Sequence, residues 1–171
     1  MQRLLHTIGY EGSTIEDVLA TLEAAEIDCV LDVREVPISR KAGFSKSALS
    51  NKLEARGISY VHFKGLGDPK AGRIAAREGR FEDFRQIFHA HLTTESAQAD
   101  LARATELVAV KTACLLCFER DPTNCHRLIL ANEMAKRKNF TLVNVKTKDR
   151  KVPVSSKGYH RAHDRTNAQF G

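Results

Sequence analysis

The segment VKTACLLCFERDPTNCHR, residues 110–127, predicts a buried strand that leads directly into a helix. Its first half is a nearly continuous apolar run, which is typical of a strand covered on both faces in a parallel sheet. Its second half contains Asp121 followed by Pro122, a common helix start, with Thr123 as an alternative cap. Ligands of parallel sheets collect where strands end. We therefore expect this junction to be the chemical centre of the chain.

Outside this segment the chain alternates between short apolar runs and amphipathic helical patterns. Further strands are expected at residues 3–9, 29–33, 58–63 and 140–145, and further helices at 14–25, 45–57, 81–92, 101–108 and 128–135. Such alternation favours parallel pairing through right-handed crossovers. We predict a doubly wound, three-layer α/β sandwich with a mainly parallel sheet of about five strands. Residues 64–80, rich in glycine and charge, are expected to form a long loop.

Length and hydropathy favour one globular domain. A chain of 171 residues that is 42% hydrophobic can bury one sizeable core and is too short for two ordinary domains. We expect a single α/β domain over residues 1–146 and a basic, flexible tail over 147–171. The sequence contains no secretion signal and no apolar run of about 18 residues, so we expect a cytoplasmic protein without a membrane partner.

The charge balance favours an anionic partner. Lys and Arg number 27 against 21 Asp and Glu, which gives a net charge of +6 and an isoelectric point near 9.3. The charge itself does not name the partner, and nucleic acid or another phosphate-bearing ligand is one possible class. On charge alone, an ordinary solvated basic surface is slightly favoured over a dedicated nucleic-acid groove.

Two of the four cysteines are expected to be core residues. Cys114 and Cys117 form a CLLC motif, but residues three apart on a strand point to opposite faces and cannot share a metal ion. Cys114 and Cys29 lie within apolar runs, where free cysteine is usually buried. We therefore assign no metal ligands from this pattern, and the sequence indicates no cofactor.

The reactive candidates follow the end of the same strand. Cys117 and Glu119, two residues apart, share a face at the carboxyl end of the strand. Cys125, His126 and Arg127 fall in the first turns of the next helix, where free N–H groups and the helix dipole favour anions and lower the pKa of a thiol. The pattern predicts either a nucleophilic thiolate or an anion pocket in which the thiol is incidental.

Other strand ends carry polar residues to the same edge. In DVREVPISR, residues 32–40, Asp32 can act as an acid–base or orienting group, and Arg34 and Arg40 can hold phosphate. Equally, Asp32 and Arg34 can form a purely structural ion pair. Further substrate-binding candidates are Gly9, Tyr10, Lys46, His62 and Lys64, of which His62 could equally be a core histidine.

The chain closely resembles the domain of unknown function 488 family. The likeness rests on five motifs in order: TIGYEG (7–12), DVREVPISR (32–40), FSKSAL (44–49), GISYVHFKGLG (57–67) and LLCFERDPTNCHR (115–127). It covers residues 1 to about 146. The resemblance implies a Rossmann-like α/β sandwich and an action on nucleic acids or nucleotides, while the reaction stays open.

Our main hypothesis is an enzyme acting on nucleic acid, nucleotide or another phosphate-bearing substrate. Arg34, Arg40, Lys64 and Arg127 would hold phosphate, and the catalytic groups would be Asp32, Cys117, Glu119, Cys125 and His126. The alternative is a non-catalytic nucleic-acid-binding module. A metalloprotein using Cys117, Glu119, Cys125 and His126 is less favoured. So is a rhodanese-like or phosphatase-like cysteine enzyme, because the loop before Arg127 contains no glycine.

Overall fold

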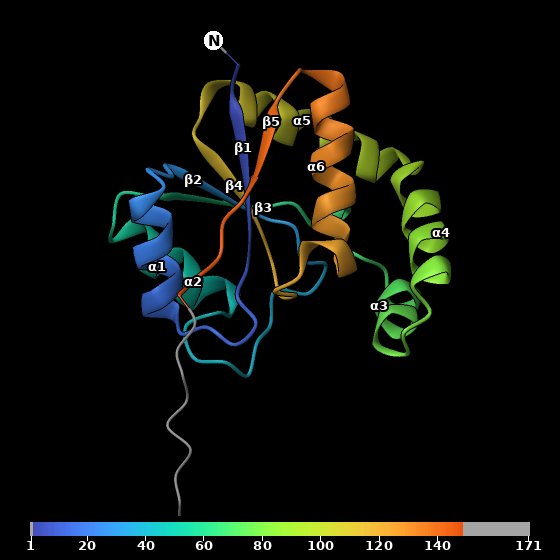
Figure 1. Cartoon of the computed structure of the whole chain (residues 1–171), viewed down its shortest axis with the longest axis horizontal. Helices are drawn as coiled ribbons and strands as arrows, with labels where there is room; N and C mark the ends of the chain where they lie inside the picture. The colour runs from blue at the N-terminus through green and yellow to red at the C-terminus, as the bar shows by residue number, and fades with distance from the viewer. Residues whose placement is uncertain (1, 149–171) are drawn as a thin grey trace, which may run out of the picture.

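Five parallel strands form a single sheet in the computed structural model, which describes residues 2–148 (Figure 1). The strands are β1 (Leu4–Gly9), β2 (Cys29–Asp32), β3 (Ser59–His62), β4 (Ala113–Cys117) and β5 (Thr141–Asn144). Their order is β3-β2-β4-β1-β5, and every pair of neighbours is parallel. The predicted parallel sheet is confirmed, and β4, from the segment that opened the sequence analysis, lies at its centre.

Helices cover both faces of the sheet and complete three layers, as in Rossmann-like proteins. Helices α1 and α2 pack on one face, whereas α4, α5 and α6 pack on the other. The helices are α1 (Ile15–Ala24), α2 (Lys46–Glu54), α3 (Lys70–Arg77), α4 (Phe81–Leu92), α5 (Glu95–Val110) and α6 (His126–Arg137), with the 3-10 turns η1 (Lys64–Leu66) and η2 (Pro122–Asn124). This arrangement confirms the predicted fold class.

The side chains of β4 alternate between the two hydrophobic cores. Leu115 and Cys117 belong to the core beneath α4, α5 and α6, whereas Cys114 and Leu116 belong to the core beneath α1 and α2. This is the two-residue period of a strand. Cys114 and Cys117 therefore lie on opposite faces, and Cys114 is a fully buried core residue.

The start of α6 differs slightly from the predicted helix start. Asp121 accepts a hydrogen bond from the backbone N–H of Thr123, but the turn that it begins is the short 3-10 turn η2. Helix α6 begins at His126, with Cys125 as its N-cap residue. Of the three residues predicted to fall in the first turns of this helix, His126 and Arg127 are its first two residues, whereas Cys125 immediately precedes it as the N-cap.

The prediction of a long loop over residues 64–80 is wrong, because η1 and α3 lie within this segment. Helix α3 is short, and its buried positions are Gly72 and Ala75 rather than large apolar residues. Its helical face is therefore easy to miss in the sequence. Gly79, with a φ of 73°, follows the helix in the left-handed conformation that often ends one. This helix contributes side chains to the site.

The described helices also bear on membrane insertion. None of the helices within residues 2–148 combines the length and hydropathy needed to cross a bilayer. The predicted basic tail, residues 147–171, lies outside the described residues except for its first two positions.

Candidate functional site

A cleft of about 460 Å³ opens at the carboxyl edge of the sheet. Residues that follow β1, β2 and β4 line it, together with residues of α3 and the first residue of α6. Parallel α/β sheets bind their ligands at this edge. The cleft is therefore the candidate functional site.

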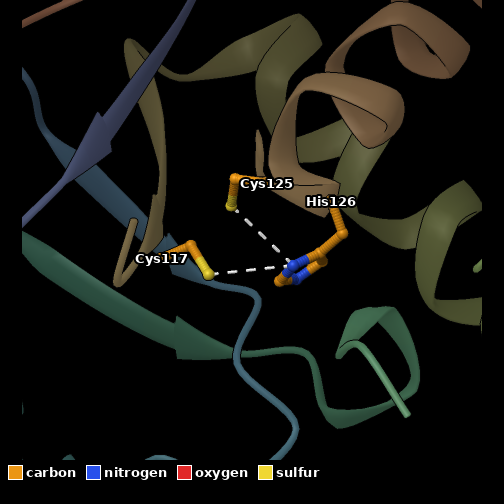
Figure 2. A group of neighbouring side chains, drawn as sticks. All are labelled: Cys117, Cys125 and His126. Carbon is orange, nitrogen blue, oxygen red and sulfur yellow. Dashed lines mark hydrogen bonds between the residues drawn. The ribbon is translucent and has the colours of Figure 1, made fainter. Parts of the chain in front are cut away.

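Two thiols and one imidazole meet beside this cleft (Figure 2). Nδ1 of His126 lies 3.7 Å from Sγ of Cys117 and 3.8 Å from Sγ of Cys125. The three donor atoms lie within 4.8 Å of one another. Nε2 of His126 is 2.7 Å from the carbonyl oxygen of Val33 and donates its proton there, which turns Nδ1 toward the sulfurs.

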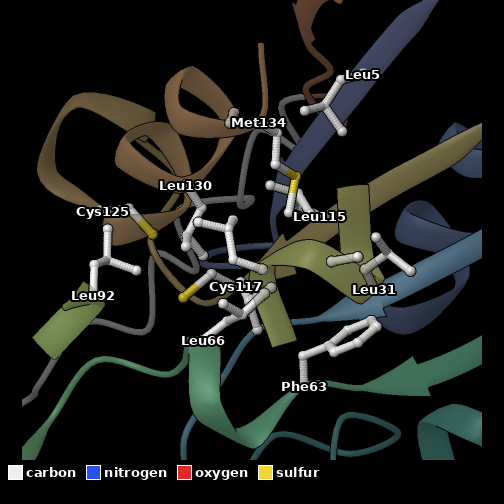
Figure 3. Packing of buried hydrophobic residues seen from close by; sticks show 14 of the residues in the cluster. Leu5, Leu31, Phe63, Leu66, Leu92, Leu115, Cys117, Cys125, Leu130 and Met134 are labelled. Carbon is white, nitrogen blue, oxygen red and sulfur yellow. The ribbon is translucent and has the colours of Figure 1, made fainter. Parts of the chain in front are cut away.

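The cluster is buried, and it reaches the cleft on one side. Cys117 and Cys125 belong to the hydrophobic core beneath α4, α5 and α6, where they pack among side chains such as Leu130 (Figure 3). Of the three cluster residues, Cys117 and His126 line the cleft and Cys125 does not. Cys117 is thus the thiol that a ligand in the cleft would meet.

Opposite charges are stabilised within the cluster. Burial opposes ionisation of Cys125, but the hydrogen bond from Cys117 and the charge of His126 together lower the pKa of Cys125 well below its usual value. The hydrogen bond with Cys125, and then burial, raise the pKa of Cys117. Burial also disfavours charged His126, but the Cys125 thiolate outweighs it and raises the pKa of His126 to about 9. The environment therefore favours the charged forms of Cys125 and His126 and the neutral thiol of Cys117.

Two carboxyl groups lie beside the cluster in the cleft. Glu119 accepts a hydrogen bond from the Cys117 thiol at 3.2 Å, and burial together with the charge of Cys125 raises its pKa to about 7. Burial raises the pKa of Asp68 to about 6, against the opposing charges of His126 and Arg73. Oδ1 of Asp68 has no hydrogen-bond partner among residues 2–148. This oxygen is buried against α3, because a Cβ added to Gly72 would lie 2.1 Å from it.

Asp32 and Arg34 form an internal bridge. The guanidinium of Arg34 donates to both carboxylate oxygens of Asp32, at 2.9 and 2.6 Å, and also to the Tyr10 hydroxyl and the Phe44 carbonyl. The Tyr60 hydroxyl donates to Asp32 at 2.6 Å. These bonds occupy Nε and both terminal nitrogens of Arg34. The geometry therefore favours a structural ion pair between Arg34 and Asp32 over a role of Arg34 in phosphate binding.

Arg127 likewise points into the protein. Only 1% of its surface is exposed, and it donates to Oγ1 of Thr7 and to the carbonyl oxygens of Glu119 and Arg120. These bonds tie the segment after β4 to β1. Gly9 lies against the same segment, where an added Cβ would be 1.8 Å from the Glu119 carbonyl oxygen. Arg127 and Gly9 shape the cleft and do not line it.

A Gly9→Ala substitution is expected to lower the free energy of unfolding by about 3 kcal/mol, because its Cβ meets backbone that no side-chain rotation can move. Urea denaturation followed by circular dichroism measures this loss. Gly79→Ala is the matched control: its Cβ meets nothing within 4 Å, so only its positive φ costs about 1 kcal/mol. Equal losses in the two variants would contradict the close contact at Gly9.

The remaining candidates divide between the cleft and its surroundings. Tyr10 and Arg40 line the cleft. Lys46 and Lys64 are exposed and lie outside its lining. His62 is half-buried, and its Nε2 is 2.7 Å from the Arg34 carbonyl oxygen, which supports the loop after β2.

Sequence reasoning missed several charged residues of the cleft. Asp68, Arg73 and Arg77 line it from α3 and the turn before that helix, and Glu35 forms a salt bridge with Arg73. All but Glu35 lie in the segment expected to be a loop. The signal that could have found them is the helical spacing of Gly72 and Ala75, which places Arg73 and Arg77, one turn apart, on a different side of the helix.

Comparison with known proteins gives one match. The family described as "Domain of unknown function DUF488" matches residues 14–134, which is more than half of the chain and includes most of the cleft. No curated protein and no solved structure matches the chain.

Proposed function

Because the chain belongs to the DUF488 family, whose description leaves the activity open, we propose a function from the cleft itself. We propose that the protein is an enzyme that acts on a nucleotide, or on a nucleotide unit of a nucleic acid. The observation that carries this proposal is the composition of one cleft, which joins guanidinium groups without a carboxylate partner and exposed apolar side chains to a thiol–imidazole–carboxylate cluster. The four unpaired cysteines fit a cytoplasmic location.

Arg40 and Arg77 are the proposed phosphate ligands. Both are exposed at the cleft, and neither forms a salt bridge with a carboxylate of residues 2–148. Arg34 and Arg73 also line the cleft, but Asp32 and Glu35 neutralise them. A guanidinium group without a carboxylate partner can donate two parallel hydrogen bonds to a phosphate. We therefore assign phosphate recognition to Arg40 and Arg77.

The rest of the cleft suits the base and sugar of a nucleotide. Asp68 brings a carboxyl group to the cleft, and a carboxyl group can pair with an amino or hydroxyl group. Phe118, which is 44% exposed, and the exposed Val36 and Ile38 give the same cleft an apolar surface. An exposed aromatic ring beside arginines is a common platform for an unstacked base.

Catalysis, rather than binding alone, is supported by the groups in the cleft wall. Cys117, Glu119 and His126 line the same cleft as the two arginines assigned to phosphate. These side chains supply the donors, acceptors and nucleophiles that group-transfer and hydrolytic reactions require. A module that only tracks a nucleic-acid backbone has no need of them.

The test of this proposal is calorimetric binding of 5′-mononucleotides and of inorganic phosphate to the full chain. Arg40→Ala and Arg77→Ala should each weaken mononucleotide binding roughly tenfold, because each removes charge-assisted hydrogen bonds to phosphate. The matched control is Arg56→Ala. Arg56 forms an exposed ion pair with Glu23 just before β3, at the opposite edge of the sheet, and its removal should leave affinity unchanged.

Turnover is measured on the same mononucleotides and on short single-stranded DNA and RNA by chromatography of the products. Glu119→Gln should bind with unchanged affinity and lose turnover. Absence of binding, or equal loss in Arg56→Ala, contradicts the proposal. Binding that falls steeply with salt and leaves every substrate intact would instead support a non-catalytic nucleic-acid-binding module.

A further inference from the structure

The thiol–imidazole cluster has the composition of a metal site. We propose that Cys117, Cys125 and His126 bind one Zn²⁺ ion, with a fourth coordination position open toward the cleft. The sequence alone ranked a metal site behind the other hypotheses. The positions of the three donor atoms in the folded chain change that order.

The distances fit tetrahedral zinc. Zinc bonds of about 2.3 Å to sulfur and 2.0–2.1 Å to nitrogen place sulfur and nitrogen ligands about 3.5 Å apart. Nδ1 of His126 lies 3.7 Å from one sulfur and 3.8 Å from the other. The two sulfurs lie within 4.8 Å of each other, and zinc bonds of about 2.3 Å would place them about 3.8 Å apart, so movements of up to about 1 Å would complete the site. Two cysteines and one histidine are also donors that zinc prefers over magnesium or calcium.

The histidine is oriented as a metal ligand. Its Nε2–H donates to the Val33 carbonyl oxygen at 2.7 Å, which leaves Nδ1 as the nitrogen directed at both sulfurs. Histidine ligands in metalloproteins nearly always donate their other N–H to such an acceptor. The ligands also come from the end of β4 and the first turn of α6, so the framework holds them in place before metal arrives.

Position in the sheet, and not burial, separates these donors from the other two cysteines. Cys117, Cys125 and His126 are each less than 5% exposed, yet Cys117 and His126 border the cleft. Cys114 lies on the opposite face of the sheet, and Cys29 begins β2 at the opposite edge. The chain thus carries two buried cysteines outside the site, which serve as matched controls.

The open position gives the ion a place in the proposed reaction. Three protein ligands with a fourth position left to water or substrate are the arrangement of catalytic zinc. Glu119, whose carboxylate is 3.2 Å from Sγ of Cys117, lies beside that position and can accept a hydrogen bond from a water molecule held there. This role rests on the proposed function, whereas the binding of zinc does not.

The test is metal analysis of the full chain, produced with zinc in the medium and purified without a histidine tag or chelator. We expect about one zinc per chain in the wild type, in Cys29→Ala and in Cys114→Ala. Cys117→Ser, Cys125→Ser and His126→Ala should each lower zinc affinity by at least about 100-fold, measured against a competing chelator. Circular dichroism checks that each variant is folded.

A second readout uses the wild type alone, so it holds even if a variant does not fold. Titration of the metal-free chain with Co²⁺ should produce thiolate-to-cobalt charge-transfer absorption and the intense visible bands of tetrahedral cobalt. The proposal is overturned if the wild type holds no stoichiometric zinc and gives no such bands, if a Cys117–Cys125 disulfide is found instead, or if the ligand variants keep their zinc. Zinc content is measured without nucleotide, and nucleotide binding through Arg40 and Arg77 is measured on the metal-free chain. Failure of one proposal is therefore distinguishable from failure of the other.

Discussion

Replacing Arg34 with methionine is expected to lower the free energy of unfolding by about 3–5 kcal/mol. The substitution leaves the carboxylate of Asp32, which has no exposed surface, without its bidentate partner. It also removes the donor to the Phe44 carbonyl oxygen. Chemical denaturation followed by far-ultraviolet circular dichroism suits this measurement, because the chain contains no tryptophan.

Two controls separate a buried ion pair from a general effect of losing arginine. Arg56→Met breaks an ion pair whose side chains are 38% and 44% exposed, and it should cost less than about 1 kcal/mol. The double variant Asp32→Leu/Arg34→Met removes both charges and should be less destabilised than the sum of the two single variants. A strictly additive double variant would show that the pair is not coupled.

Replacing Arg127 with methionine is expected to cost about 3–4 kcal/mol, for a different reason. Arg127 has no carboxylate partner among the hydrogen bonds of residues 2–148. It donates to Thr7 and to the carbonyl oxygens of Glu119 and Arg120, and a buried acceptor left without a donor costs about 1–3 kcal/mol. The same change should speed hydrogen exchange of amides in residues 118–124, since those carbonyls lose their anchor.

The pattern of exchange distinguishes this anchor from a general loss of stability. In Arg34→Met, the faster amides should cluster in the loop after β2, whereas in Arg127→Met they should cluster in the loop after β4. Arg127→Lys keeps the charge and some donors and should recover part of the lost stability. If Arg127→Met unfolds at the same denaturant concentration as the wild type, the anchoring role assigned to Arg127 is wrong.

Parallel topology explains how much of the site could be predicted from sequence. A fixed strand period places Cys114 and Cys117 on opposite faces, and parallel strands bring the residues after β1, β2 and β4 to one edge. These conclusions need only local pattern and connectivity. Tyr10, Arg40 and the Cys117–His126 junction could therefore be predicted to lie near one another.

The direction of each guanidinium group could not be predicted in the same way. An arginine after a strand can donate to a ligand or to acceptors inside the protein, and the choice depends on residues far away in the chain. The partner Thr7 is 120 residues from Arg127 in sequence. Helix α3 escaped prediction because it has only eight residues and buries the small Gly72 and Ala75, within a segment rich in glycine and charge. Arg77 lies in this helix and was therefore not predicted as a residue of the site.

The strand order also governs what a ribosome-bound chain can form. β1 pairs with β4 and β5, whereas β2 pairs with β3 and β4. The two amino-terminal strands, β1 and β2, therefore do not pair with each other, because β4 lies between them. At synthesis rates of about 5–20 residues per second, β4 is synthesised on the order of 5–20 seconds after its neighbour β1. During that interval an apolar strand is available to chaperones or to other nascent chains. The reactive cluster lies at the end of β4 and the start of α6, so its residues are synthesised after β1, β2 and β3 and can meet only late in translation.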